Sequence, residues 1–472
     1  MYIERVRIEN IRGFRDGSLS VDIDFRRPDN KLPGWTVIAG RNGTGKSSFL
    51  KAIALAVAGP SAARTLLESY RGWVHEGSTT GTVNLGLIPH EKDRFQGLGK
   101  IPKNFDAELR WSVDAASVSL EPSLEASPKK ETKLRGPWRG PWTDNPKGWF
   151  VAGYGPFRRL TGHAADAQRL MVAPNHVSRL VSLFREDASL VECVQWLKSV
   201  YLRRLEGREG ARELEAAVLQ LLNDGLLPDD TAVERVDSDG LWVSQSGTTL
   251  PLRELSDGYR VSVALVLDIV RQLFECYGEF PLLTTSGGDL AVQLPGVVIA
   301  DEIDAHLHVS WQQRIGFWLK SRFPFVQFLV STHSPFICQA ADPRGLIRLP
   351  APGENATASH VPEDVFKSVV HGGADTAVLT SLFGLERTWS EDTERLRTEL
   401  ARLRAKEITG KASLPEKARI KDLQMELPLG PSTEVDKALR EITAVLDIDI
   451  SEQKTQRLAD ASDNAQASNP KD

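Results

Sequence analysis

The eight residues Gly40 to Ser47, GRNGTGKS, constrain the fold more than any other stretch of the chain. They follow the apolar segment WTVIAG and precede a segment whose apolar residues recur at helical spacing. A strand, a glycine-rich turn and a helix in this order are the context of a phosphate-binding loop, in which backbone N–H groups and a helix N-terminus surround an anion. We predict that Lys46 reaches the β- and γ-phosphates of a nucleotide and that the Ser47 hydroxyl binds Mg²⁺. A glycine-rich turn without a ligand is the alternative.

A second stretch, VVIADEIDAHLH from Val297 to His308, runs from an apolar strand into three acids and two histidines. Adjacent carboxylates at a strand end are costly to desolvate unless a cation or a proton shares their charge. An acid-ended strand is the second half of a phosphate-loop NTPase, so we predict that Asp301 holds Mg²⁺ and that Glu302 is the general base for water. A transition-metal site on His306 and His308 is the alternative, but residues two apart point in different directions.

Two shorter stretches accompany these motifs. LSDGYR, Leu255 to Arg260, precedes a helical pattern, and on its own it would be interpreted as a serine N-cap. FLVSTHSP, Phe328 to Pro335, places His333 directly after an apolar strand, where a structural histidine is the alternative to a functional one. The segments PGVVIAD and VQFLVSTH consist largely of apolar residues, which predicts a parallel sheet buried on both faces.

Composition limits the class of protein. The 472 residues include 41% hydrophobic residues, enough for the cores of two or three domains. The formal charge of -5 gives no overall attraction to DNA or RNA, so such a contact would need a local patch. The cysteines, Cys193, Cys276 and Cys338, form no CxxC pair, which argues against a disulfide framework or a cysteine zinc site. The N-terminus has the pattern of a strand and no apolar run approaches the roughly 20 residues of a membrane span, so we expect a soluble, cytoplasmic protein.

The pattern along the chain indicates an α/β fold with a mixed sheet, a β-rich lobe, an inserted helical subdomain and a helical C-terminal region. Five regions are expected: a first core segment with the β-rich lobe (1–164), the helical insertion (165–228), a second core segment (229–350), the C-terminal helical region (351–450) and a disordered tail (451–472).

In this order, GRNGTGKS, LSDGYR, VVIADEIDAHLH and FLVSTHSP resemble the ABC-type ATPases of the SMC, RecF and OLD group, and IENIRGF near the N-terminus is similar to that group's opening strand. The resemblance spans most of residues 1–340. It implies a P-loop fold of ABC type and a head-to-tail dimer that holds two ATP molecules between its subunits. It further implies that Ser256 and Gly258 contact the γ-phosphate on the other subunit. Asp304 would cross the interface, and His333 would be the switch histidine.

The same resemblance implies a set of nucleotide-binding residues in the loop and the first helical turn, together with Arg12, which would lie near the nucleotide. These are Arg12, Gly40, Arg41, Asn42, Gly43, Thr44, Gly45, Lys46, Ser47 and Ser48. The chain departs from the family at the glutamine loop, because GWFVAGYGPFRRL occupies that place without a glutamine. The remaining Mg²⁺ ligand is therefore open. Arg158 lies in a YGxxR stretch that resembles one in related defence ATPases, which makes it a candidate for phosphate or subunit contact.

The chain has a single ATPase head, no long coiled-coil arms, and no clustered acids after His333 that resemble the nuclease domain of OLD-type proteins. In this it resembles the ATPases of Septu-type and retron-linked antiphage systems, which act with a separate HNH-type nuclease subunit. We expect an ATPase that converts ATP and water to ADP and phosphate, regulates such a partner, and has no nuclease activity of its own. A RecF-like DNA-repair ATPase and a nucleotide-gated scaffold are the alternatives, and Glu302 argues against the scaffold.

The C-terminal region carries expected helices from about Trp389 to Pro428, with a capping box, SLPE, at the start of the second. An apolar stripe of Leu396, Leu400 and Leu403 would bind the partner or a second dimer, or else pack on the chain's own ATPase domain.

The segment SPKKETKLRGPWRGPW, Ser127 to Trp142, is the strongest candidate for nucleic-acid contact. Its lysines and arginines would bind phosphates, and Trp138 and Trp142 would stack on bases. An exposed basic loop without a ligand is the alternative.

Overall fold

The computed structural model describes residues 1–114, 122–126, 136–158, 175–227, 231–385 and 387–427. The chain divides into two units, Met1–Glu386 and Arg387–Asp472. The first unit contains all four motifs of the sequence. It also extends past residue 350, where we expected the core to end, and includes two short helices, α11 (Glu363–Val370) and α12 (Ala374–Val378).

A six-stranded sheet in the first unit carries the motifs. Its strands, in spatial order, are β16 (Ser359–His360), β15 (Leu346–Arg348), β3 (Gly34–Ala39), β14 (Val326–Ser331), β13 (Gly296–Ala300) and β7 (Val151–Tyr154). Neighbours from β15 to β7 are parallel, and β16 is antiparallel to β15. Every residue of β13 and β14 is buried, which confirms the expected sheet covered on both faces.

Side chains alternate between two cores along these strands. Val298 of β13 and Phe328 of β14 join a core with α8 (Asp257–Tyr277) and α9 (Val309–Arg322), whereas Val297 and Leu329 join a core with α1 (Lys46–Leu66). Because the strands are parallel, the loop after β3, the acids after β13 and His333 after β14 leave the sheet at the same edge.

An antiparallel sheet forms the β-rich lobe. Its order is β2 (Val21–Asp24), β1 (Tyr2–Glu9), β4 (Thr80–Ile88), β5 (Phe105–Ser112) and β6 (Ser123–Ala126). Buried and more exposed residues alternate along β4 and β5, so one face of this sheet packs on α1. The Gln327 side chain of β14 bonds both the N–H and the carbonyl of Ile3 at 2.8 Å, which joins the two sheets where β1 has a bulge.

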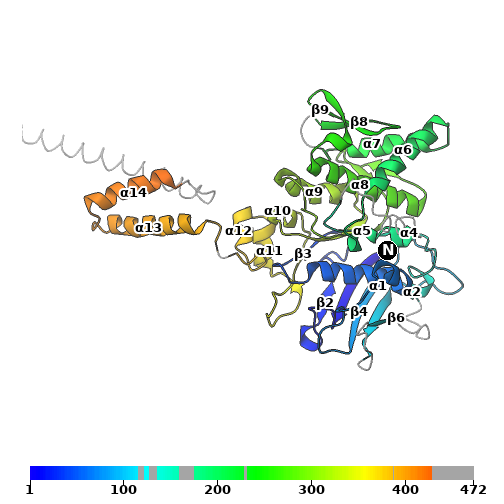
Figure 1. Ribbon diagram of the computed structural model, residues 1–472, viewed down its shortest axis with the longest axis horizontal. Coiled ribbons are helices and arrows are strands. Elements are labelled where there is room, and N and C mark those ends of the chain that lie inside the picture. Colours follow the sequence, from blue (N-terminus) through cyan, green and yellow to red (C-terminus); the bar gives the residue numbers. More distant parts are fainter. Residues whose placement is uncertain (115–121, 127–135, 159–174, 228–230, 386, 428–472) are drawn as a thin grey trace, which may run out of the picture. The chain divides into compact units, whose positions relative to one another are not determined.

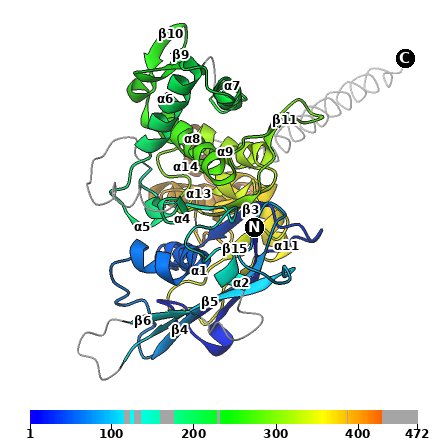
Figure 2. The ribbon, with the colours of Figure 1, turned by 90° about the vertical axis from the view of Figure 1, so that its right-hand side faces the viewer.

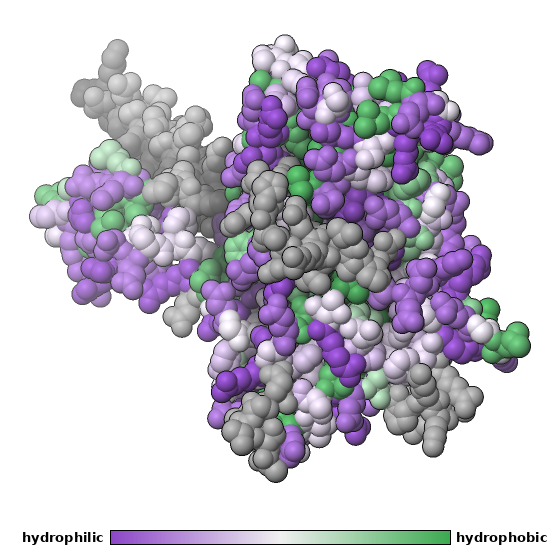
Figure 3. Space-filling model, turned by 45° about the vertical axis from the view of Figure 1, so that its right-hand side comes forward, coloured by the Kyte–Doolittle hydropathy of each residue, from purple (hydrophilic) through white to green (hydrophobic). Residues whose placement is uncertain are grey.

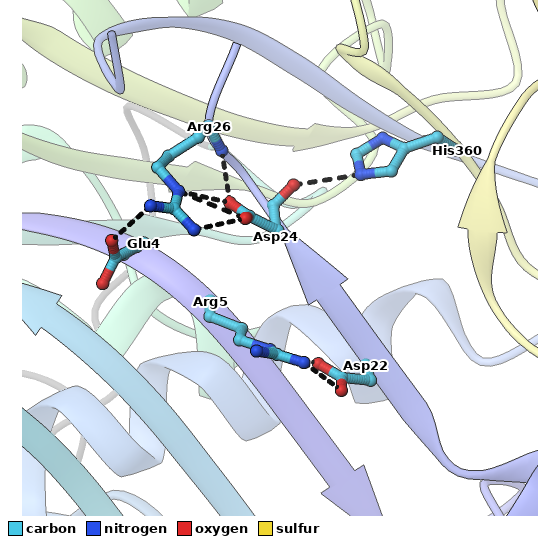
Figure 4. A network of polar contacts seen from close by, with 6 residues as sticks. All are labelled: Glu4, Arg5, Asp22, Asp24, Arg26 and His360. Atoms are coloured by element: carbon cyan, nitrogen blue, oxygen red, sulfur yellow. Dashed lines mark hydrogen bonds and ion pairs between the residues drawn. The ribbon is translucent and has the colours of Figure 1, made fainter. Parts of the chain in front are cut away.

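Polar contacts also link β2 to the edge of the central sheet (Figure 4). Arg26 pairs with both carboxylate oxygens of Asp24, and Arg5 pairs with Asp22. His360 of β16 places its Nε2 3.0 Å from the Asp24 carbonyl oxygen. Exposed ion pairs of this kind contribute little stability by themselves, so the buried contacts hold the lobe in place.

Helix α1 is interrupted near its end, and a tryptophan compensates for the interruption. Gly59 has a φ of 83° and Pro60 follows it inside the helix. Pro60 has no N–H to donate to the carbonyl of Ala56, four residues earlier. The indole N–H of Trp142, which is buried, donates to that carbonyl at 3.0 Å. Trp142 is thus a core residue, so the expectation that it stacks on nucleic-acid bases is wrong.

The structure describes only the second part of the basic segment, residues 136–142. Trp138 packs edge-on against Trp142 at a centroid distance of 5.3 Å, and Arg139 donates to loop carbonyls including those of Gln96 and Lys100. Residues 127–135, which hold all three of its lysines, lie outside the described residues. Nucleic-acid contact by that stretch stays a prediction.

Among the described residues α1 is long and apolar enough to cross a membrane by length and composition. The expectation that no apolar run approaches a span does not hold for α1 by this measure. However, 78% of its apolar window is buried inside the protein. A core helix passes the same test, so α1 gives only weak indication of a membrane span.

Two helices and a small sheet form the end of the first unit that lies far from the β-rich lobe (Figures 1 and 2). The helices are α6 (Val191–Leu205) and α7 (Ala211–Leu222), and the sheet joins β10 (Thr248–Pro251), β9 (Gly240–Gln245) and β8 (Thr231–Asp237). The short helices α4 (Asn175–Ser178) and α5 (Val181–Phe184) pack against α1 instead. Within the expected helical insertion, 165–228, these four helices lie between residues 175 and 222, and residues 165–174 and 228 lie outside the described residues.

Shorter elements connect these regions: η1 (Gly17–Leu19), α2 (Gly136–Arg139), η3 (Leu252–Glu254), β11 (Leu282–Thr284), β12 (Leu290–Val292) and α10 (Pro335–Cys338). On the face drawn in Figure 3, hydrophilic residues cover most of the described surface and hydrophobic residues are scattered among them.

The second unit is a helical hairpin of α13 (Glu391–Ile408) and α14 (Leu414–Glu426). The expected capping box is present, because Ser413 forms one with Glu416, and α13 is capped by Ser390, which accepts a hydrogen bond from the Thr393 N–H.

The apolar stripe of this unit packs between its own two helices. Leu403 forms a cluster with Ile420, Leu423 and Leu427, and Leu396 and Leu400 pack against it. These contacts are with α14, which neither of the two sequence interpretations anticipated. The tail, 451–472, and the preceding residues 428–450 lie outside the described residues.

Candidate functional site

The phosphate loop turns through backbone conformations that favour glycine. Gly43 and Gly45 have φ angles of 81° and 91°, in the left-handed region that L side chains rarely adopt. Gly45 is also the N-cap of α1, and a Cβ there would lie 3.1 Å from the Phe14 ring. A Cβ on Gly40 would meet the Thr44 hydroxyl at 2.8 Å. Glycine at these positions lets the loop close tightly before the N-terminus of α1.

Lys46 lies inside this loop. Its exposed fraction is 7%, and its Nζ donates to the carbonyl oxygens of Gly40 at 2.9 Å and Arg41 at 3.2 Å. Burial lowers the pKa of Lys46, and the charges of Asp301 and Glu302 oppose that shift. An ammonium group held by loop carbonyls, with acids nearby, is placed to bind an anion.

The hydroxyl groups of the loop and of the first turn of α1 differ in their contacts. The Thr44 hydroxyl is buried and has no hydrogen-bond partner among the described residues. Ser47 and Ser48 are half-buried in the first turn of α1. The Ser47 hydroxyl also has no hydrogen-bond partner in the described stretches of the chain.

Three arginine and asparagine side chains surround the loop. Arg41 and Asn42 are exposed, and the Arg41 guanidinium donates to the Gly384 carbonyl oxygen. Arg12 places its Nη1 3.3 Å from the Ser48 hydroxyl oxygen, and its guanidinium carbon lies 4.8 Å from the Trp73 ring centroid. Burial lowers the pKa of Arg12. The structure thus brings Arg12 next to the phosphate loop.

The two acids after β13 are held by a hydroxyl on the neighbouring strand. Asp301 is buried, and its carboxylate accepts a hydrogen bond from the Ser331 hydroxyl. The Glu302 N–H donates to the same Ser331 oxygen at 2.8 Å. Glu302 has a φ of 46°, an unusual conformation for a residue other than glycine, and it is half-buried. Ser331 therefore holds both acids at the sheet edge.

The turn beyond these acids is held in a similar way. Thr332 donates to the Asp304 carboxylate, and the N–H of Ser334 donates to the Thr332 hydroxyl at 2.9 Å. His308 is the N-cap of α9, and its side chain accepts from the Ser310 N–H. The described residues contain no group of three or more His, Cys, Asp or Glu side chains that could hold a metal ion by themselves. His308, one of the two histidines of the alternative metal site, therefore has a structural role as a helix cap.

Arg158 lies among these acids. It follows β7, which pairs with β13, and its side chain is buried. Its Nη2 donates to the Glu302 carbonyl oxygen at 2.7 Å. Burial lowers the pKa of Arg158 to about 10, and the charges of Asp304, Asp301 and Glu302 oppose that shift. The sequence suggested a phosphate or subunit contact, and the contact that the structure gives is with the backbone of Glu302.

The signature segment opens α8. Ser256 is the exposed N-cap of this helix, and its side chain makes no capping hydrogen bond. A Cβ on Gly258 would lie 3.3 Å from the His306 carbonyl oxygen, so the helix start packs closely on the turn after the acids. His333 is also exposed, directly after β14. Ser256 and His333 thus present polar side chains at the surface.

A cavity of about 230 Å³ lies beside the phosphate loop. Its lining includes Phe14, Gly45 and Ser48 on one side and Pro352 and Thr357 on the other. A larger cavity, of about 550 Å³, lies between α6, α7 and α8, and none of the predicted site residues lines it. The phosphate loop forms a wall of the smaller cavity and, through Gly40 and Arg41, of a further cavity of about 240 Å³, so these two are the better candidates for the nucleoside moiety of a nucleotide.

Sequence reasoning missed Ser331 and Thr332. Both lie within FLVSTHSP, but only His333 received a role there. The signal was present, since two hydroxyl-bearing residues stand at the end of a largely apolar strand that is entirely buried. A buried hydroxyl needs a hydrogen-bond partner, and the acid-ended strand is the nearest source of one.

Comparison with known proteins gives two family matches. Residues 5–98 match an AAA domain, and residues 180–339 match an AAA domain described as a putative AbiEii toxin of a type IV TA system. The first match contains the phosphate loop, and the second contains the signature segment and both acids.

The chain aligns with only part of the length of its curated relatives. The Septu protein PtuA of Bacillus mycoides (strain KBAB4) is 25% identical over 339 residues, which cover 71% of this chain and 38% of PtuA. The retron Ec83 probable ATPase of Escherichia coli is 32% identical over 152 residues, 32% of this chain and 25% of that protein. The chain therefore aligns with well under half of the length of either relative.

Among solved structures, an Smc head bound to the C-terminal winged-helix domain of ScpA matches with a TM-score of 0.42 and 15% identity, over 76% of this chain and 98% of that one. The sequence matches, together with the phosphate loop and the acid-ended strand of a parallel sheet, relate the chain to AAA-domain ATPases and, among curated proteins, to Septu PtuA and the retron ATPases.

Proposed function

We propose that the protein binds ATP and hydrolyses it to ADP and phosphate. The observation that carries this proposal is the position of Lys46, buried in a glycine-closed loop with the charges of Asp301 and Glu302 acting on it. The loop follows β3 and the acids follow β13, two strands that both flank β14. A cation and a pair of acids at one edge of a parallel sheet suit a triphosphate and its hydrolysis.

The residues also suit Mg²⁺, which prefers oxygen ligands. Ser47 and Asp301 would hold the ion, since the Ser47 hydroxyl has no partner among the described residues and Asp301 is a buried carboxylate. When bound, Mg²⁺ would supply positive charge against the phosphates. Glu302 would accept a proton from the attacking water, and His333 would orient that water.

A head-to-tail dimer would complete the site. The Ser256 hydroxyl is exposed and makes no cap within its own helix, so it is free to meet the γ-phosphate held by another protomer. Gly258 would let that helix start approach closely, and Asp304 would contribute to the interface. In this arrangement each ATP is bound by the loop of one subunit and the signature segment of the other.

The biological role that we propose is regulation of a separate nuclease, of HNH type, in cytoplasmic antiphage defence. Sequence similarity to Septu PtuA and to retron ATPases supports this role. The hairpin of α13 and α14 would bind the partner through a surface other than its apolar stripe, because that stripe packs between the two helices.

Purification of the tagged chain, expressed together with its neighbouring genes, tests the role. A nuclease subunit that stays bound through size exclusion, together with ATPase activity in the complex, would support the proposal. A chain that purifies alone, cleaves DNA with added metal, or gains turnover only with DNA ends would contradict it.

A further inference from the structure

The segment from Tyr154 to Arg158 contacts both acids of the neighbouring strand through their backbones. The Asp301 N–H donates to the Tyr154 carbonyl oxygen at 2.8 Å. The Glu302 carbonyl oxygen accepts from Arg158 Nη2 at 2.7 Å. One short segment after β7 therefore determines where the backbone of each acid lies.

Contacts from other elements hold Glu302 in a conformation that its own backbone does not favour. Its φ of 46° lies in the left-handed region, which is strained for a residue other than glycine. Its N–H donates to Ser331, and its carbonyl accepts from Arg158 and from the Ala305 N–H. The direction of the Glu302 side chain therefore depends on these contacts.

The Arg158 guanidinium is buried close to the acids. The exposed fraction of Arg158 is 1%, and its Nε and Nη1 have no hydrogen-bond partner among the described residues. Burial of a charge is costly unless opposite charges compensate it. Asp301, Glu302 and Asp304 supply that compensation, so the cation is retained where the acids are.

Tyr154 links the same segment to the signature helix. Its hydroxyl donates to Asp268 of α8 at 2.9 Å, and Asp268 also accepts from Arg271 at 2.8 Å. Tyr154 and Asp268 are both buried, so this contact is shielded from water. A displacement of α8, which begins next to Ser256, would be transmitted through Tyr154 to the acids.

We propose that Arg158 is a positioning residue that sets the direction of Glu302, and that Tyr154 couples this setting to α8. The proposal rests on the proposed ATPase function. It assigns to Arg158 an effect on turnover that acts through Glu302, and little effect on nucleotide binding.

Arg158→Gln tests the first half of the proposal, with Arg179→Gln as a matched control. Arg179 is also buried, and its Nε and Nη1 also lack hydrogen-bond partners among the described residues. Its guanidinium lies 5.6 Å from the Phe150 ring centroid, and its charge acts on Cys276 and His176. It therefore matches Arg158 in burial without the contact to the acids.

Arg158→Gln should lower kcat about 10-fold or more with the Kd for ATP nearly unchanged. Arg158→Lys should recover some of the lost kcat, because it keeps the charge but not the planar donor group. Arg179→Gln should change thermal stability and leave kcat near that of the wild type. A folded Arg158→Gln protein with wild-type kcat would overturn the proposal.

The double variant with Glu302→Gln gives the decisive comparison. If Arg158 acts through Glu302, adding Arg158→Gln to Glu302→Gln should cause no further loss of kcat. Losses that multiply in the double variant would overturn the proposal. Should Arg158→Gln not fold, Arg158→Lys gives the same comparison.

Tyr154→Phe tests the coupling, because it keeps the carbonyl that bonds Asp301 and removes the hydroxyl that bonds Asp268. It should lower kcat and leave the Kd for ATP unchanged, and unchanged kcat would overturn the coupling. A wild-type protein that does not hydrolyse ATP would instead refute the proposed function, so the two failures are distinguishable.

Discussion

The hydroxyl oxygen of Ser331 accepts a hydrogen bond from the backbone N–H of Glu302 at 2.8 Å. The same hydroxyl donates to the Asp301 carboxylate, so one side chain orients both acids. Ser331 is completely buried at the end of β14. Its removal would leave a buried N–H and a buried carboxylate each without this partner.

Ser331→Ala should therefore lower ATP turnover about 10-fold or more, since a hydrogen bond to a charged group contributes about 1.5–3 kcal/mol. Steady-state kinetics with ATP measures this effect. Ser331→Thr keeps the hydroxyl and should retain most of the activity. Equal loss in both variants would show that packing, and not the hydroxyl, sets the rate.

Glu302→Gln should bind ATP and hydrolyse it about 10²- to 10⁴-fold more slowly, because an amide cannot accept the proton of water as a general base. The variant should accumulate an ATP-bound dimer, measured by light scattering with and without ATP. If the dimer forms without nucleotide, light scattering cannot report ATP binding, and the rate of ATP hydrolysis alone tests the role of Glu302. Normal turnover in Glu302→Gln would show that another base is used.

Lys46→Ala should weaken ATP binding about 10- to 100-fold or more, because the charge-assisted hydrogen bonds to the phosphates are lost. Calorimetry with a nonhydrolysable ATP analogue measures the change. Lys31→Ala is a suitable control, since the Lys31 side chain is 69% exposed and forms an ion pair with Asp29. Equal affinities of the two variants would contradict the assignment of the phosphate loop.

The sequence predicted those features that short stretches determine. The glycine loop, the apolar strands and the capping box at Ser413 depend on neighbours a few residues away, and the structure has all three. Contacts between distant residues could not be predicted in the same way. Glu302 meets Ser331 across 29 positions and Arg158 across 144, and only the sheet order brings them together.

Trp142 shows how a reasonable pattern led to a wrong role. An aromatic residue in a basic, glycine- and proline-rich segment is typical of a nucleic-acid contact. The residue that determines its place is Pro60, which leaves the Ala56 carbonyl without a helical donor, 86 positions before Trp142. No local pattern near Trp142 contains that information.

Trp142→Phe should lower the free energy of unfolding by about 1–3 kcal/mol, because the buried Ala56 carbonyl would lose its donor while an aromatic ring is kept. Thermal or chemical denaturation measures the change. Binding of single-stranded DNA should be the same in the variant and the wild type. Weaker DNA binding with unchanged stability would restore the original interpretation of this residue.

A head-to-tail dimer predicts that two inactive variants restore each other. Lys46→Ala lacks a working phosphate loop and Ser256→Arg lacks a working signature segment, so each homodimer should be inactive. In a mixed dimer the intact loop of the Ser256→Arg protomer faces the intact Ser256 of the Lys46→Ala protomer.

Random mixing of the two variants in equal amounts should therefore recover about a quarter of wild-type turnover, because half of the dimers are mixed and each mixed dimer has one complete site of two. Co-expression with two different tags allows the mixed dimer to be isolated and assayed. An inactive mixed dimer, with both variants folded and dimeric, would contradict a shared site, because a site built from two protomers must be complete in that pairing.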